Sequence, residues 1–188
     1  MKNNTLFDLF KAKAEAMNAE VHRFSNNSEA LSFIIDTLKK EQIMDKSKSY
    51  AAWADCPFLE GVDKEALSRE VPGLKFNITK SLAADAKIGI SQMQWALAGT
   101  GTLVQNSTAI EQRLVSTLTE IHIAIINAGE ILPDLSSVLS KISPDKAEFI
   151  AFITGPSRTA DIERVLTIGV HGPERLIIVC VDGEGKKT

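Results

Sequence analysis

The feature that most constrains the fold is a set of short, continuously apolar segments in the second half of the chain. They lie at residues 121–126, 149–153 and 175–181, and each is typical of a strand without polar alternation. A strand that is apolar on both faces must be covered on both faces, as in a parallel sheet between helical layers. Helical patterns at residues 109–117 and 134–142 alternate with these strands. The sequence therefore predicts a three-layer α/β/α fold with a mostly parallel sheet.

The first 48 residues follow a different pattern and are expected to form an N-terminal helical arm. Residues 5–19 and 29–41 each place apolar side chains on neighbouring helical turns. Residues 20–24 between them are expected to be a short extended link. The chain is thus divided into an arm at 1–48, a main domain at 49–183 and a tail at 184–188. Further short strands are expected at 50–54, 74–78, 87–91 and 102–105.

Charge and hydropathy limit the partners that the chain can have. Its 24 acidic and 21 basic residues are well mixed and give a net charge of −3. Nucleic-acid binding needs clustered basic residues, so no nucleic-acid partner is predicted. No segment approaches the roughly 18 consecutive apolar residues of a membrane span, and no secretory signal is recognisable. We therefore expect a cytoplasmic protein without a membrane span.

Cysteine and histidine usage gives no sign of a metal centre. An iron–sulfur cluster needs about four thiolates, whereas this chain has only Cys56 and Cys180. Cys180 lies in an apolar segment, where a thiol is an ordinary core group, and nothing near Cys56 suggests an activated thiol. The histidines, His22, His122 and His171, share no metal-ligand spacing. We predict neither a metal nor a cofactor.

Two glycine-bearing turns are candidate ligand sites, and the first spans residues 99–102. Gly101 allows a positive φ and a close approach of a ligand to the backbone. Successive amides, with the hydroxyls of Thr100 and Thr102, would form a nest for a phosphate or a carboxylate. The alternative is a tight strand-to-strand turn capped by its own threonines, and we favour it because Gly-Thr sequences are common in turns.

The second candidate turn begins at Gly155, directly after the strand that ends at Ile153. We expect it to emerge at a carboxyl edge of the sheet, where open α/β sheets bind ligands. Ser157 or Thr159 is expected to cap a short helix beginning at Ala160. The free N–H groups at the start of such a helix attract anions, so the turn is a candidate anion site.

Charged residues give this second turn a binding chemistry. Arg158 carries a planar cation suited to bidentate binding of carboxylate or phosphate. Asp161 would lie in the first helical turn, where a carboxylate interacts favourably with the helix dipole. His171, in the nearby turn 169–173, could act as an acid–base group or as an orienting hydrogen-bond group. The alternative is that Arg158 and Asp161 pair with neighbours and only fix the loop. No nucleophile motif occurs, so no residue is assigned as catalytic.

Four motifs occur in a fixed order, at residues 100–104, 120–124, 155–163 and 169–173. Together they resemble the LUD domain family, of the lactate-utilisation protein C (LutC/YkgG) type, from about residue 50 to residue 182. The resemblance implies a fold like that of the NagB/RpiA/CoA-transferase group. It also implies a role in oxidising L-lactate to pyruvate together with two iron–sulfur partner proteins. This chain would be the cluster-free accessory component, binding a small anion or a partner.

The sequence departs from the family pattern at two places. Gly99 stands where the family usually has an acidic residue, and the proline usual near Thr119 is missing. The first departure weakens a role for a carboxylate nucleophile on this turn, as in CoA transferases, so binding is expected rather than catalysis. Whether the chain is an enzyme stays open. The alternatives are a stand-alone enzyme acting on a sugar phosphate or acyl-CoA, suggested by fold analogy alone, and a non-catalytic scaffold.

Overall fold

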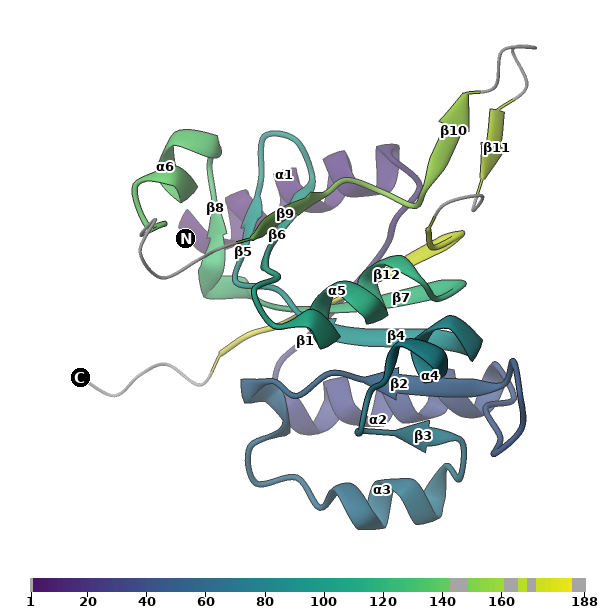
Figure 1. The fold of residues 1–188 in the computed structure, drawn as a ribbon. Coiled ribbons are helices and arrows are strands. Elements are labelled where there is room, and N and C mark those ends of the chain that lie inside the picture. Colours follow the sequence, from purple (N-terminus) through teal and green to yellow (C-terminus); the bar gives the residue numbers. More distant parts are fainter. Residues whose placement is uncertain (1, 143–148, 161–165, 169–171, 184–188) are drawn as a thin grey trace.

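The computed structural model describes residues 2–142, 149–160, 166–168 and 172–183. Its centre is a six-stranded sheet in which every neighbouring pair is parallel, with the order β1-β12-β7-β4-β2-β3 (Figure 1). In that order the strands are Glu20–Phe24, Arg175–Val181, Ile121–Asn127, Ala86–Gln92, Tyr50–Trp53 and Leu74–Lys75. The α/β class and the mostly parallel sheet expected from the apolar segments are confirmed.

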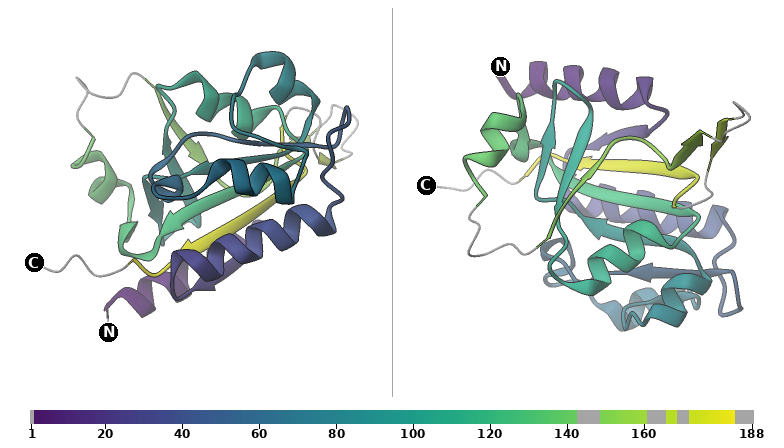
Figure 2. Two further views of the ribbon diagram at one scale, coloured as in Figure 1. Left: turned by 90° about the horizontal axis from the view of Figure 1, so that it is seen from below. Right: turned by 45° about the horizontal axis from the view of Figure 1, so that its top comes forward.

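Helices cover both faces of this sheet and complete the three layers (Figures 1 and 2). One face packs against α2 (Asn27–Lys40), the short helix η1 (Pro57–Leu59) and α3 (Lys64–Glu70). The other face packs against α1 (Lys2–Ala16), α4 (Lys80–Asp85) and α5 (Ile110–Thr117). Alternate residues of β7 therefore enter different cores, with Ile123 on the α2 side and Ala124 on the α1 side. This two-sided burial explains why the strand is apolar throughout.

A second sheet of four strands lies on the α1 side, in the order β8-β5-β6-β9. Its strands are Ile131–Leu132, Trp95–Leu97, Thr102–Asn106 and Ile150–Ile153, and the short helix α6 (Leu135–Leu139) follows β8. The expectation of a buried strand at 149–153 in the main sheet is wrong. β9 is an edge strand antiparallel to β6, and Phe149 and Phe152 are about half exposed, at 53% and 46%. A short apolar run does not by itself distinguish these two situations.

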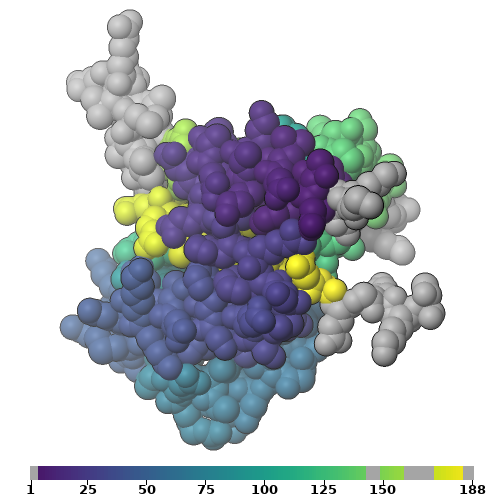
Figure 3. Space-filling model, turned by 180° about the vertical axis from the view of Figure 1, so that it is seen from behind, coloured from purple at the N-terminus to yellow at the C-terminus, as the bar shows by residue number. Residues whose placement is uncertain are grey.

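The segment expected to be a helical arm takes part in both the sheet and its covering layers. Residues 20–24, expected to be a link, form β1, which pairs in parallel with β12. Phe10 and Ala14 of α1 are fully buried, as are Ile34 and Leu38 of α2. Figure 3 shows the residues of α1, β1 and α2, in purple to blue, extending across this face of the molecule. The domain boundary at residue 49 stays a prediction.

Residues 158–160 form a strand, β10, where the sequence indicated the start of a helix. β10 (Arg158–Ala160) pairs antiparallel with β11 (Leu166–Ile168), and the hairpin projects from the body of the molecule (Figure 1). The expectation that a helix begins at Ala160 is therefore wrong, because Ala160 is the last residue of a strand. The β-branched residues in both segments favour an extended backbone, which explains the difference. The expected tail, 184–188, lies outside the described residues.

Candidate functional site

Both glycine turns lie at the amino edge of the six-stranded sheet, against the C-terminal end of α1. The φ angles of Gly101 and Gly155 are +67° and +68°. A Cβ atom on Gly101 would lie 2.4 Å from the backbone nitrogen of Ala14, and one on Gly155 would lie 2.3 Å from the carbonyl oxygen of Met17. Only glycine combines this conformation with so close an approach. The two glycines thus serve to dock both turns on α1.

The position of the second turn differs from the expected carboxyl edge. The amide of Ser157 donates to the carbonyl of Pro173 at 2.8 Å, and Pro173 precedes the first residue of β12, Arg175. This contact places the turn beside the amino ends of the parallel strands. The expectation is wrong because β9 belongs to the second sheet, where it runs antiparallel to β6. The carboxyl end of β9 therefore leads to the amino edge of the six-stranded sheet, beside Pro173.

The fold brings the two predicted turns together through a row of threonine hydroxyls. Oγ1 of Thr102 lies 2.7 Å from Oγ1 of Thr100 and 2.8 Å from Oγ1 of Thr154. The amides of Gly99 and Gly101 donate to backbone carbonyls at 3.0 and 2.9 Å. Those two amides are therefore already engaged within the fold. Ligand binding by Thr100, Gly101 and Thr102 stays a prediction.

Arg158 also contacts the end of α1. Its Nη2 donates to the carbonyl oxygen of Met17 at 2.9 Å, which places a cation at the C-terminal end of a helix, where the helix dipole favours it. Thr159 pairs with Thr167 in the β10–β11 hairpin. Asp161 and His171 lie outside the described residues. The roles of Gly155, Ser157, Arg158 and Thr159 in ligand binding stay predictions.

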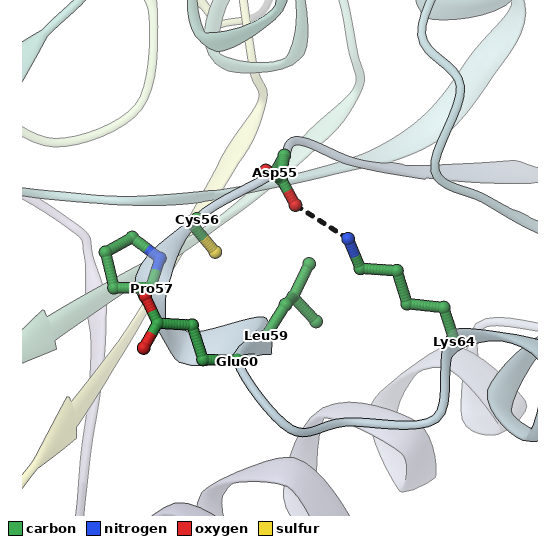
Figure 4. Close-up of a pocket in the computed structure, with 6 residues that line it drawn as sticks. All are labelled: Asp55, Cys56, Pro57, Leu59, Glu60 and Lys64. Atoms are coloured by element: carbon green, nitrogen blue, oxygen red, sulfur yellow. Dashed lines mark hydrogen bonds and ion pairs between the residues drawn. The ribbon is translucent and has the colours of Figure 1, made fainter.

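A crevice of about 360 Å³ opens at the carboxyl edge, where the sequence indicated no site (Figure 4). The chain runs outward from β2 to the edge strand β3, then returns to β4 and continues to β7. The connections thus diverge between β2 and β4, and this kind of topological switch point is where open α/β sheets bind ligands. The crevice is lined by Asp55, Cys56, Pro57, Leu59, Glu60 and Lys64.

The crevice contains charged groups of both signs. Nζ of Lys64 lies 2.6 Å from Oδ1 of Asp55, and Glu60 supplies a second carboxylate. Cys56 is half-buried at the start of η1, and burial raises the pKa of its thiol. Among the described residues, no group of three or more His, Cys, Asp or Glu side chains is placed to hold a metal ion.

A buried polar network connects this crevice to the interior. The Ser91 hydroxyl lies 2.8 Å from Nε2 of His122 and accepts a hydrogen bond from Nε2 of Gln105 at 2.9 Å. Nε2 of Gln105 also donates to Gln112 at 3.2 Å, and Nε2 of Gln112 donates to the carbonyl of Asp55 at 2.9 Å. Ser91, Gln105 and His122 are at most 1% exposed. The network holds the crevice loop against α5 and β6.

Burial decides the charge state of this network. It lowers the pKa of His122 to about 4, so the imidazole is neutral near pH 7. Nδ1 of His122 has no hydrogen-bond partner in the part of the chain that the structure describes. The network was missed at the level of sequence, although single polar residues within otherwise apolar strands were a signal for it. Such residues need a buried partner, because an unpaired polar group is costly.

Comparisons with known proteins agree with this fold. The sequence model of the LUD domain family matches residues 7–181. A crystal structure of a DUF162 family protein from Deinococcus radiodurans is similar, with a TM-score of 0.69 at 14% identity, covering 96% of this chain and 99% of that one. None of the helices in the described residues is long and apolar enough to cross a membrane.

Several curated relatives carry the name lactate utilization protein C. The one from Macrococcus caseolyticus is 32% identical over 168 residues, which is 84% of this chain and 68% of that protein. Lactate utilization protein C 1 from Bacillus mycoides is 36% identical over 108 residues, 54% of this chain and 46% of that protein. The matched region is thus about half the length of the second relative.

Proposed function

The chain belongs to the LUD domain family, and we propose that it acts in lactate utilisation as a component without its own iron–sulfur cluster. The observation that carries the proposal is the family match over residues 7–181, together with relatives named lactate utilization protein C. The proposed reaction is the oxidation of L-lactate to pyruvate by a set of proteins. In that set this chain binds a small anionic ligand, a partner protein, or both.

The positions of the two cysteines support a division of labour with cluster-bearing partners. Oxidising lactate to pyruvate removes two electrons and two protons, so an electron acceptor is needed. Cys180 is fully buried on the α1 side of the sheet, whereas Cys56 packs against the core on the α2 side. The two thiols lie on opposite faces and do not serve as two ligands of one cluster. We therefore assign the iron–sulfur chemistry to partner proteins.

Co-purification tests this division directly. The full chain, tagged and expressed in its own organism during growth on L-lactate, is expected to retain proteins that contain iron and acid-labile sulfide. A matched purification from cells grown without lactate controls for adventitious binding. Isolation of the chain alone under both conditions would count against the proposal.

The ligand part of the proposal concerns the amino-edge turns. Arg158 contacts the C-terminal end of α1 through the carbonyl of Met17, and Gly101 and Gly155, the sequence neighbours of the hydroxyl row formed by Thr100, Thr102 and Thr154, pack against the same helix end. A guanidinium with neighbouring hydroxyls can bind the carboxylate of a hydroxy acid. A ligand that binds only the folded chain raises its melting temperature. Thermal shifts are therefore expected with L-lactate or pyruvate, and not with sodium chloride at equal ionic strength.

An Arg158→Gln variant separates ligand binding from stability. The substitution removes a contact to α1 and is expected to lower the melting temperature in the absence of ligand. The informative quantity is the further shift that the carboxylate causes. The proposal expects this ligand-induced shift to disappear in the variant. An unchanged shift would exclude Arg158 from the site.

A further inference from the structure

The four-stranded sheet ends at β9, which has β6 as its single neighbour among the described strands (Figure 1). Residues 149–154, which include β9, read Phe-Ile-Ala-Phe-Ile-Thr and contain neither a charge nor a proline. Two of these side chains, Phe149 and Phe152, are about half exposed. An uncharged apolar edge is a template on which another chain can add a strand, and proteins usually protect such edges. The edge of β9 lacks that protection.

The other three edges of the two larger sheets are protected. β1, at one end of the six-stranded sheet, carries Glu20 and Arg23. β3, at the other end, is two residues long and contains Lys75. β8, the far edge of the four-stranded sheet, is also two residues long and is followed by Pro133. Short strands, charges and proline all oppose pairing with another chain. Among these four edges, β9 is therefore the one on which a partner strand can add.

The ladder between β6 and β9 determines which backbone groups face such a partner. The amide of Ser107 donates to the carbonyl of Phe149 at 2.8 Å, and this register continues along β9. Along an antiparallel ladder, hydrogen-bonded pairs alternate with pairs that do not bond. Ala151 therefore bonds to β6, whereas the N–H and C=O groups of Ile150 and Phe152 point away from it. No backbone partner for these outward groups is found in the part of the chain that the structure describes.

Side chains give the edge an apolar face on one side of the sheet. Trp95, Val104 and Phe152 lie opposite one another on β5, β6 and β9 and form a row across the sheet. Ile150, two residues before Phe152, lies on the same side of the strand and packs against a buried cluster that includes Val104. Phe152, at the end of the row, is 46% exposed. A strand added beside β9 would continue the row and cover Phe152.

We propose that β9 is a dimerisation strand, which pairs antiparallel with β9 of a second copy of this chain. A two-fold axis, the symmetry of most dimers, places a strand antiparallel to itself. With the axis at Ala151, Ile150 of each copy lies opposite Phe152 of the other. Both outward-facing residues of each strand then form hydrogen bonds, whereas any other register carries one of them past the end of β9. Aliphatic and aromatic side chains that meet in this way stabilise a sheet.

Charge favours a second copy as the partner. A two-fold axis brings like residues near one another, where charges of one sign would repel, and residues 149–154 carry none. A charged partner segment would lose hydration beside this edge without gaining an opposite charge on the strand. The cation beside the edge, Arg113, already stacks on the ring of Phe149 at 4.4 Å and donates to the carbonyl of Ser107. The inference does not depend on a role in lactate utilisation.

Sedimentation velocity of the full chain from about 5 to about 500 µM tests the proposal, because an interface below about 1,200 Å², as expected for two short strands, associates weakly. We expect the fraction of dimer to rise with concentration. Phe152→Lys should weaken dimerisation at least about tenfold, because the dimer would bury two charges without partners. Met44→Lys adds the same charge at a side chain that is 50% exposed in the loop after α2, so this matched control should dimerise like the unmodified chain. A monomer at every concentration, or a dimer that Phe152→Lys leaves intact, would overturn the proposal.

Amide hydrogen exchange measured by NMR locates the interface without any variant. The N–H groups of Ile150 and Phe152 should exchange fast at the lowest concentration and slowly at the highest. The N–H groups of Ala151 and Ile153, which face β6, should exchange slowly at both and serve as the internal control. If the exchange of Ile150 and Phe152 does not change with concentration while the chain dimerises, the interface lies elsewhere and β9 is not the dimerisation strand.

Discussion

His122 makes the stability of the fold depend on pH in a way that a single substitution can isolate. The side chain is 1% exposed, and burial lowers its pKa from 6.5 to about 4. The unfolded chain therefore takes up a proton near pH 6.5, while the folded chain does so only near pH 4. Between these values, falling pH favours the unfolded state, so the free energy of unfolding decreases as the pH falls.

The magnitude follows from the pKa values of His122 in the unfolded and folded chains. A tenfold difference in proton affinity between the two states corresponds to about 1.4 kcal/mol, so the loss contributed by His122 reaches about 3 kcal/mol once the pH has fallen to 4. Between about pH 7.5 and about pH 5 the same linkage predicts a loss of about 2 kcal/mol. A His122→Gln variant keeps a hydrogen-bonding group for Ser91 but does not titrate in this range. It should lack this contribution.

Urea unfolding followed by circular dichroism measures the free energy of unfolding of both proteins at the two pH values. His22, whose pKa is also lowered, chiefly by burial, and all carboxylates are common to both proteins, so the difference in pH dependence isolates His122. We expect the unmodified protein to lose about 2 kcal/mol more than His122→Gln on going from pH 7.5 to pH 5. Parallel losses in the two proteins would refute the idea that His122 is buried in its neutral form.

Two further substitutions test the packing and the charges. Gly101→Ala should lower the free energy of unfolding, measured in urea, by about 3 kcal/mol or more, because the added methyl group would meet the backbone of α1. Gly61, with φ +74°, has open space around it, so Gly61→Ala should lower the free energy of unfolding by only about 1–2 kcal/mol, through backbone strain. Similar costs for the two would contradict the docking role of Gly101. Glu41→Gln should lower the free energy of unfolding by about 1 kcal/mol, because this side chain, 17% exposed, pairs with Lys87 at 2.7 Å and with Arg175 at 2.7 Å. Glu70 pairs with Lys39 in an exposed position, so Glu70→Gln should change the free energy of unfolding by no more than about 0.5 kcal/mol. The hydrogen bonds from Lys87 and then Arg175 lower the pKa of Glu41, so the stability that Glu41 contributes should be lost as the pH falls below 4.5, the ordinary pKa of a glutamate. A stability difference between Glu41→Gln and the unmodified protein that does not change with pH would contradict this.

Local patterns were sufficient to predict the class of fold and several helix starts. The helical patterns at residues 29–41 and 109–117 correspond to α2 (Asn27–Lys40) and α5 (Ile110–Thr117). The apolar segments at residues 121–126 and 175–181 form β7 and β12, as expected for strands that are buried on both faces. The LUD family, expected from four motifs, is confirmed by the comparison over residues 7–181.

Features that depend on tertiary contacts were not predicted. β1 was missed because Glu20–Phe24 mixes charged and apolar residues, and only its pairing with β12 makes it a strand of the sheet. β9 was assigned to the wrong sheet because an edge strand and a central strand can have the same short apolar run. The crevice depends on the order of the strands in the sheet, which local patterns do not determine. It also depends on the loop after β2, where the carbonyl of Asp55 accepts a hydrogen bond from Gln112 of α5. The glycines of the two turns were considered as points where a ligand could approach the backbone, but tertiary packing places the end of α1 against both Gly101 and Gly155.

Growth on L-lactate is the most direct test of the proposed role. The gene for the chain is deleted in its own organism, and growth with L-lactate as the sole carbon source is compared with growth on pyruvate. We expect the deletion to abolish or strongly slow growth on lactate alone, and a copy of the gene for the full chain to restore it. Growth on lactate at the parental rate after deletion would contradict the account.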